Sequence, residues 1–148
     1  MNPNVKLSEK FAVMATLDPA SVAVGTVVTA FVPLTNFLNV LALIQTGVLG
    51  ASATVDAKLR QATDAAGTGV KDITGKALVQ LVAATSNNKQ VLIECSANDL
   101  DATNGYGFVA LSLTVGTAAS IVGASLIGGN PRYAPTAAFN QAATVQVV

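Results

Sequence analysis

The residues of this chain best suited to chemistry are a small group of acids and amides in its second half. Glu94, Asp99 and Asp101 lie close together in the sequence, with Asn98 and Asn104 among them. Carboxylate and amide oxygens are the ligands that Ca²⁺ prefers. The segment from Asp99 onward partly matches a calcium-binding loop, but its third ligand position is a threonine and the distal glutamate is missing. We therefore expect a solvated loop held by its own side chains, with ion binding as the alternative.

The sequence lacks the residues that other common catalytic and cofactor-binding sites need. The sequence contains no histidine, so a serine–histidine triad would have no base, and zinc would have too few of its preferred ligands. Gly75-Lys76 does not open a phosphate-binding loop, because Ala77 follows where that motif needs Ser or Thr. The single cysteine, Cys95, lies in an apolar run and is expected to be buried. We expect no enzyme activity, no cofactor and no resident metal.

Charge is scarce and unevenly distributed. Charged residues make up 11% of the sequence and the net charge is zero, whereas soluble domains carry about a quarter of their residues as charges. The stretch Pro19–Val55 has none, and Ala102–Val148 has one, Arg132. Zero net charge argues against nucleic acid or an anionic membrane surface as partner. It favours self-association or a protein partner instead.

Membrane insertion through a helix is not expected. The most apolar stretch, Phe37–Val55, approaches the length of a spanning helix. Asn39, Gln45 and two glycines interrupt it. We therefore predict buried strands in this stretch and no membrane partner.

A few large side chains in the charge-poor half are candidates for contacts between subunits. Arg132 and Tyr133 stand between two prolines, and arginine and tyrosine are enriched at interface hot spots. The alternative is that Arg132 ends the last strand and binds carbonyl groups. Tyr106 and Phe139 complete the set of interface residues that the sequence predicts.

The elements that must position these residues are short strands. In Thr54–Arg60, apolar and polar residues alternate, which predicts a half-buried strand with its charged face in water. Tyr106–Val115 alternates in the same way, and Ser120–Ile127 is expected to follow it as the partner strand of a hairpin. Asp18-Pro19 is expected to end the first strand, and Gly128-Gly129 the last.

These patterns predict an all-β fold and one domain. Seven to nine short strands separated by Gly, Pro, Asn and Asp indicate a single-domain antiparallel β-sandwich, jelly-roll-like, with extended N- and C-terminal arms. We assign residues 1–10 to an N-terminal arm, 11–135 to the sandwich and 136–148 to a C-terminal tail. The tail is apolar and uncharged, so we expect it to dock on a neighbouring molecule.

The second half of the chain resembles a family of small structural proteins of tailed bacteriophages. The resemblance rests on Tyr106–Thr117, on Ser120–Leu126 and on the closing segment Gly128-Gly-Asn-Pro-Arg-Tyr-Ala-Pro135. With weaker matches upstream, it extends over roughly residues 40–135.

The resemblance implies a virion component that decorates the capsid surface. Its partners would be the major capsid protein and further copies of itself, as a dimer or trimer, and it would act as a cement protein between neighbouring capsid subunits. The alternatives are another virion component (neck, tail or fibre base) and a glycan-binding β-sandwich module. An enzyme that uses Glu94, Asp99 or Asp101 is the last alternative.

Overall fold

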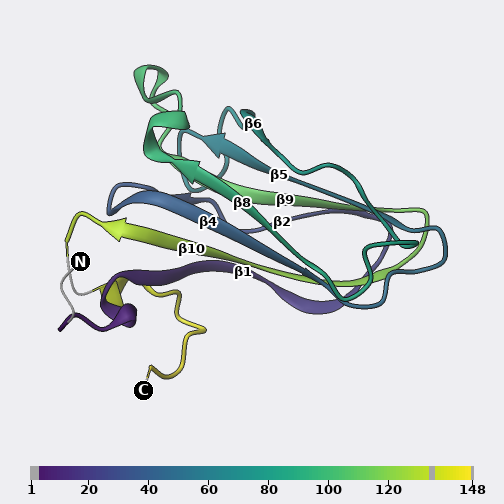
Figure 1. Cartoon of the computed structure of the whole chain (residues 1–148). Coiled ribbons are helices and arrows are strands. Elements are labelled where there is room, and N and C mark those ends of the chain that lie inside the picture. Colours follow the sequence, from purple (N-terminus) through teal and green to yellow (C-terminus); the bar gives the residue numbers. More distant parts are fainter. Residues whose placement is uncertain (1–3, 134–135, 148) are drawn as a thin grey trace.

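The computed structural model describes residues 4–133 and 136–147, and it is a sandwich of two antiparallel sheets (Figure 1). The first sheet, sheet A, has the strand order β1-β10-β4-β8. Its strands are β1 (Phe11–Val22), β10 (Ser120–Pro131), β4 (Phe37–Thr46) and β8 (Gln90–Ser96).

The second sheet, sheet B, has the order β2-β9-β5-β6, and two further short strands pair with its central strands β9 and β5. Its strands are β2 (Gly25–Val28), β9 (Phe108–Gly116), β5 (Thr54–Ala62), β6 (Lys71–Ala77), β3 (Val32–Pro33) beside β9, and β7 (Leu81–Val82) beside β5. Four short 3₁₀ turns complete the described chain: η1 (Leu7–Glu9), η2 (Ala97–Asp99), η3 (Ala102–Asn104) and η4 (Thr136–Phe139).

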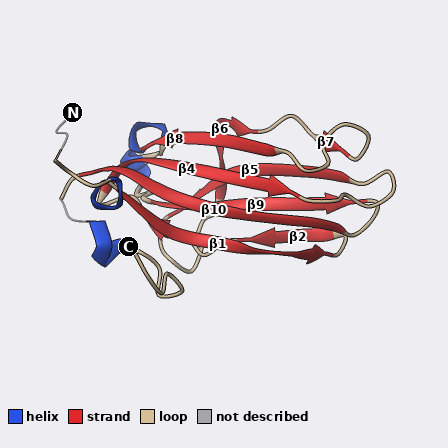
Figure 2. Ribbon diagram, turned by 60° about the horizontal axis from the view of Figure 1, so that its bottom comes forward, coloured by secondary structure: helices blue, strands red, loops and turns tan. Residues whose placement is uncertain are grey.

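The strand order is that of a jelly roll. The eight main strands pair as β1 with β10, β2 with β9, β4 with β8, and β5 with β6. The chain thus forms one long hairpin whose tip lies between β5 and β6, and successive strand pairs alternate between the two sheets (Figure 2). Two packed sheets with this nested order define the jelly roll. The predicted β-sandwich is confirmed.

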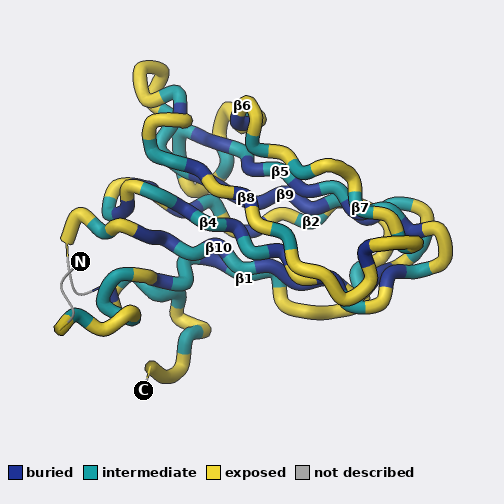
Figure 3. Tube along the Cα trace, in the orientation of Figure 1, coloured by how far each residue is buried: buried dark blue, intermediate teal, exposed yellow. Residues whose placement is uncertain are grey.

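The core lies between the sheets and is built from alternate residues of the four central strands. Figure 3 shows buried positions along all four strands. They alternate with less buried ones in β4 and β5, whereas residues 109–113 of β9 are all buried. The buried side chains include Val40, Ala42 and Ile44 of β4, Val55, Ala57 and Leu59 of β5, Val109, Leu111, Leu113 and Val115 of β9, and Val122, Ala124 and Leu126 of β10. The alternation predicted for β5 and β9 is therefore confirmed, with the predicted apolar face turned inward in each.

The predicted hairpin between Tyr106–Val115 and Ser120–Ile127 is wrong. β9 lies in sheet B and β10 in sheet A, so residues 117–119 cross from one sheet to the other. Each strand buries one apolar face against the common core. The alternation of apolar and polar residues looks the same whether two strands pair within one sheet or face each other from different sheets.

Two predicted strand ends are also wrong. β1 continues through Asp18-Pro19 to Val22, with a register shift between Leu17 and Ala20. Because β1 is an edge strand, Pro19 is tolerated without the N–H that a central strand would need.

β10 continues through Gly128-Gly129 to Pro131, and the two glycines do not end it. A Cβ at Gly128 would lie 2.8 Å from the ring of Phe37, and one at Gly129 would lie 3.1 Å from the ring of Phe11. The glycines make room for aromatic rings beside the strand.

The first part of the predicted C-terminal tail packs on its own chain. The Thr136 hydroxyl bonds the carbonyl oxygens of Ser8 (2.9 Å) and Phe11 (2.7 Å), and Gln141 N–H donates to the Val13 carbonyl at 2.7 Å. Phe139 lies edge-on to Phe37, with ring centroids 5.6 Å apart. For residues 136–141, the docking surface that we expected on a neighbour is therefore supplied by the chain's own β1 and core.

Some sequence predictions fall on residues outside the described part. These are the start of the N-terminal arm at residues 1–3, Ala134-Pro135 of the closing motif, and Val148 at the end of the tail. Among the described residues, no helix has the length and hydropathy to cross a bilayer.

We expect the inter-sheet core to dominate stability. Leu111 is fully buried at the centre of sheet B, so Leu111→Ala should lower the free energy of unfolding by about 2–5 kcal/mol through lost burial and the cavity left behind. The control Val79→Ala, at a side chain 89% exposed, should change it by less than about 0.5 kcal/mol. Urea unfolding followed by circular dichroism measures both, and equal effects would contradict this view of the core.

Candidate interface surfaces

The outer face of sheet A carries an apolar patch, because strand register aligns apolar residues of neighbouring strands across it. One row runs from Val13 through Ile127 and Leu41 to Glu94. The next row runs from Thr16 through Ser125 and Leu43 to Leu92, which is 59% exposed. Phe11 and Ile121, 42% and 46% exposed, lie toward opposite ends of the same face. At one end of this face lie η1 and the C-terminal segment, whose Gln141 donates to the Thr16 hydroxyl at 3.2 Å. No further strand or helix of the described chain covers the rest of it.

A groove of about 430 Å³ lies at one end of this face. The 3₁₀ turn η1, the outer face of β1, β10 and β4, and the C-terminal segment enclose it. Its apolar lining is made by Leu7, Phe11, Val13, Leu41, Ile127 and Val147. Its polar members, Asn140 and Ser8 among them, lie at the C-terminal segment and at η1. The groove is therefore suited to an apolar, uncharged occupant.

The outer face of sheet B is polar and carries ion pairs. Lys58 and Arg60 of β5 both reach Asp72 of β6, at 2.7 Å and 3.1 Å. Gln80 donates to Asp56 at 2.8 Å. The charged face predicted for Thr54–Arg60 therefore does point away from the core, and neighbouring side chains leave it half-exposed. The outer face of sheet B is thus polar, whereas that of sheet A combines an apolar patch with polar residues such as Thr16, Ser125 and Glu94.

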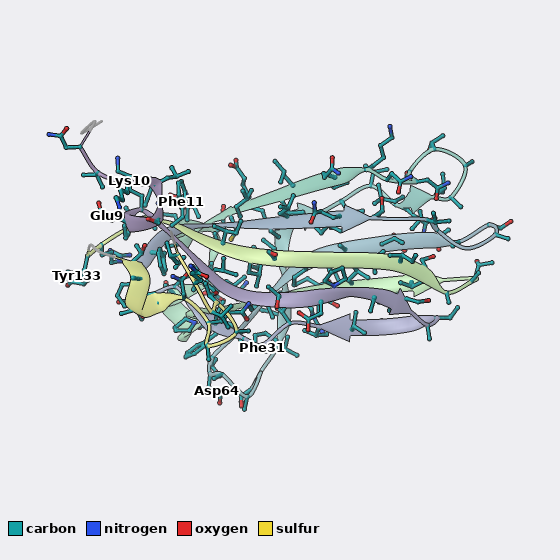
Figure 4. The ribbon with its side chains drawn as sticks, turned by 90° about the horizontal axis from the view of Figure 1, so that it is seen from below. Glu9, Lys10, Phe11, Phe31, Asp64 and Tyr133 are labelled. Atoms are coloured by element: carbon teal, nitrogen blue, oxygen red, sulfur yellow. The ribbon has the colours of Figure 1, made fainter. Side chains whose placement is uncertain are left out.

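The four predicted interface residues lie toward the end of the sandwich where β10 finishes and β9 begins, but they do not form one cluster. Arg132 and Tyr133 are exposed just beyond β10, and Figure 4 shows Tyr133 at the same end as Glu9 and Lys10. The Tyr106 hydroxyl donates to the Gly69 carbonyl at 2.9 Å, and Lys71 Nζ lies 4.1 Å from its ring centre. Phe139 is half-buried against Phe37 of its own chain. A role in subunit contacts stays a prediction for all four.

Arg132 lies directly after the last residue of β10, and it is its backbone that bonds a carbonyl group, so binding of carbonyl groups by its side chain stays a prediction. Its N–H donates to the Asn36 carbonyl at 2.9 Å, which extends the pairing of β10 with β4 beyond Pro131. Arg132 as a whole is exposed to solvent.

The carboxylates of the acidic segment, Asp99 and Asp101, are already bonded by neighbouring groups. Asp99 accepts from the Ser96 backbone N–H at 2.7 Å and pairs with Lys76 at 3.0 Å. Asp101 pairs with Lys71 at 2.5 Å and accepts two bonds from the Asn104 amide. These contacts are those of a loop capped by its side chains. Within residues 4–133 and 136–147, no three acidic, cysteine or histidine side chains are grouped as metal ligands would be.

These contacts lower the pKa of both carboxyl groups. The backbone N–H of Ser96, with Lys76, holds the pKa of Asp99 below its ordinary value. The ammonium group of Lys71, with the amide of Asn104, does the same for the pKa of Asp101. Both groups are therefore anions that stabilise the loop, and neither is poised as a general acid near neutral pH.

Cys95 is buried, as the sequence predicts. Burial raises the pKa of its thiol to about 12. A thiol with such a pKa is protonated at neutral pH and is a poor nucleophile or metal ligand.

Sequence reasoning did not predict that Leu92 and Phe11 are exposed at the surface. The signal was present in Gln90-Val-Leu-Ile-Glu-Cys95, where both alternating sets contain apolar residues. Such two-sided apolar strands are typical of sheets covered on both faces. In this structure the inner set, Ile93 and Cys95, is buried, and Leu92 of the outer set is left uncovered.

No model of a known protein family and no curated protein matches the chain. Among solved structures, a chain from the structure of infectious bursal disease virus, Gx strain, is similar at 10% identity with a TM-score of 0.40. The alignment covers 84% of this chain and 32% of that chain. At this level of similarity no function is transferred, and the resemblance to tailed-phage proteins stays a prediction.

The ion pairs predict a stability loss in acid. The folded pKa of Asp101 is below its ordinary value of about 4, so its contribution is present above that pH and is lost as the pH falls through the folded value. Asp101→Asn should therefore be less stable than the parent at pH 7, and the difference should shrink in acid. The control Asp18→Asn changes a carboxylate that binds the Thr16 hydroxyl and should show a smaller difference. Thermal melts between pH 2 and 7 measure this, and a pH-independent gap for Asp101→Asn would contradict it.

Proposed function

We propose that the protein is a virion structural protein that decorates a tailed-phage head and holds neighbouring capsid subunits together. The observation that carries this proposal is the apolar patch on the outer face of sheet A, with Leu92, Phe11 and Ile121 exposed, on a sandwich whose core is already complete. Large exposed apolar patches mark interaction sites on soluble proteins. The partner in this proposal is the major capsid protein.

The asymmetry of the two faces supports an orientation on such a surface. The ion-paired face of sheet B, with Lys58, Arg60 and Asp72, is already compatible with water. The face of sheet A, with Ile127, Leu41 and Leu92, gains from being covered. A capsid presents the same site many times, so modest affinity at each site is enough when contacts between copies add to it.

The proposed role is non-enzymatic. The most acidic segment of the chain uses its carboxylates, Asp99 and Asp101, in ion pairs and caps. Cys95 is buried with a raised pKa. Asp99 and Asp101 thus have structural contacts, whereas Glu94, the third acidic residue considered for catalysis, is exposed on the outer face of sheet A.

A glycan-binding role has less support. Sugar-binding sandwiches stack sugar rings on aromatic faces, and the two tyrosines are the natural candidates. Lys71 occupies one face of the Tyr106 ring, and Tyr133 is exposed beyond the end of β10 and apart from the groove lining.

Copy number tests the proposed role. Particles from a lysate that contains this protein should be pelleted through a density cushion, and the chain quantified against the major capsid protein by peptide mass spectrometry. Decoration predicts a ratio within a few-fold of one. About a dozen copies per particle would favour the neck, tail or fibre base, and recovery only in the supernatant would refute the virion role.

A second prediction tests the face. Ile127→Lys places a charge in the central row of sheet A and should abolish binding to undecorated heads, because burying an unpaired ammonium group is costly. The control Thr26→Lys places the same charge on an exposed position of β2 in sheet B and should bind like the parent. Co-sedimentation with heads measures both, after circular dichroism has shown that both variants fold. Equal binding by the two variants would show that the outer face of sheet A is not part of the interface.

A further inference from the structure

The free edge of β8 is an unguarded strand edge. β8 pairs with β4 on one side, and no strand of the described chain pairs with its other side. Its register with β4 runs without a shift from Gln90 to Ser96, and it contains no proline or glycine. A long, regular edge of this kind presents unpaired N–H and C=O groups to another strand.

The register shows which backbone groups are free. Thr46 N–H donates to the Lys89 carbonyl at 2.9 Å, which makes this a hydrogen-bonded pair. Hydrogen-bonded and non-hydrogen-bonded pairs alternate along antiparallel strands. Val91 and Ile93 therefore bond β4, and the N–H and C=O groups of Gln90, Leu92 and Glu94 point away from it.

The other three sheet edges are each guarded. β1 carries Asp18, Pro19 and two register shifts, and the C-terminal segment bonds the backbone of Val13. β2 has four residues. β6 has charged Lys71, Asp72 and Lys76, a glycine at positive φ (Gly75) and an irregular register with β5. These are the devices by which proteins prevent edge-to-edge pairing. β8 has no proline, glycine or register shift, its one charged residue is Glu94, and only the N–H of Ser96 at its end is capped, by Asp99.

We propose that β8 is a homodimer interface, in which the β8 strands of two copies pair antiparallel across a two-fold axis at Leu92. This arrangement extends sheet A of one copy into sheet A of the other. Each pair of facing residues with outward backbone groups exchanges two N–H···O=C bonds. The facing pairs are Leu92 with Leu92 of the second copy, and Gln90 with Glu94 of the second copy in both directions.

The side chains are self-complementary in this register. Leu92 of one copy lies beside Leu92 of the other, and Leu43, its neighbour on β4, continues the apolar row on both sides of the axis. Glu94 faces the amide of Gln90, which can donate to it, and the two glutamates do not face each other. An isologous contact of this kind needs one patch that complements itself, which makes a second copy the occupant.

The proposal concerns association of the purified chain and does not depend on the virion role. Ile127, the residue that tests capsid binding, lies on β10, two strands away from the β8 edge. The two proposals can therefore fail separately.

Backbone blocking tests the interface. Leu92→Pro removes an N–H that β4 does not use, and prolines are tolerated at such edge positions. Sedimentation equilibrium of the purified full chain should show a dimer. Leu92→Pro should raise its dissociation constant at least about tenfold, the equivalent of one or two backbone hydrogen bonds. The control Leu92→Ala keeps the N–H and should weaken the dimer less. A monomeric parent, or a dimer that Leu92→Pro leaves unchanged while folded, would overturn the proposal.

Cross-linking tests the register and does not depend on whether the proline variant folds. In a Cys95→Ala background, Leu92→Cys should form a covalent dimer on mild oxidation, because directly facing Cα atoms about 5.5 Å apart suit a disulfide. Glu94→Cys alone should not, but mixed with Gln90→Cys it should. The control Ile121→Cys, exposed on β10 of the same face, should stay monomeric on reducing-agent-free gels. Cross-linking through Ile121 and not Leu92 would indicate face-to-face stacking and overturn the edge interface.

Discussion

Burial of one alternating set of side chains between two sheets is the constraint on which the rest of this structure depends. Leu111, Leu113, Ile44 and Leu126 meet in that layer. Because the side-chain period of a strand is two, turning these residues inward also determines which residues turn outward. The outer rows of sheet A, through Leu41 and Leu43, and the ion-paired face of β5 are both consequences of this single choice. Shifting any central strand by one residue would exchange its core and surface residues.

The two outer faces of the sandwich differ in polarity. On sheet B, Lys58, Arg60 and Asp72 form exposed ion pairs, which add little stability but keep that face compatible with water. On sheet A, several outward positions are apolar, among them Leu41, Leu43 and the exposed Leu92. The edges show the same contrast, since β1 is covered by the chain's own C-terminal segment and β8 is open. The proposed partner surface and the proposed dimer edge thus lie on the same sheet, at different positions.

Much of the fold could be predicted from particular residues. The alternation of Thr54–Arg60 predicted both the strand and its charged outer face, and the alternation of Tyr106–Val115 predicted its buried one. The errors arose where a residue type has two uses. Pro19 stops a central strand but is harmless on an edge, and Gly128-Gly129 can end a strand or admit the ring of Phe37. The candidate site was predicted less well. The aromatic and arginine residues chosen from sequence do not form one cluster. Leu92 was missed because both alternating sets of Gln90–Cys95 contain apolar residues, and the exposed one among them was not considered.

The sequence by itself determined the all-β class, the identity of the inward sets in β5 and β9, the burial of Cys95 and the lack of histidine chemistry. These properties depend on residue type and local period, which are properties of the chain alone. Only the tertiary structure decided that β9 and β10 join different sheets, that residues 136–141 return to β1, and that no strand of the described residues pairs with the free side of β8. These are choices between distant backbone partners. Alternation states which face of a strand is buried, but every strand offers the same N–H and C=O groups, so its neighbours are decided by how the whole chain packs.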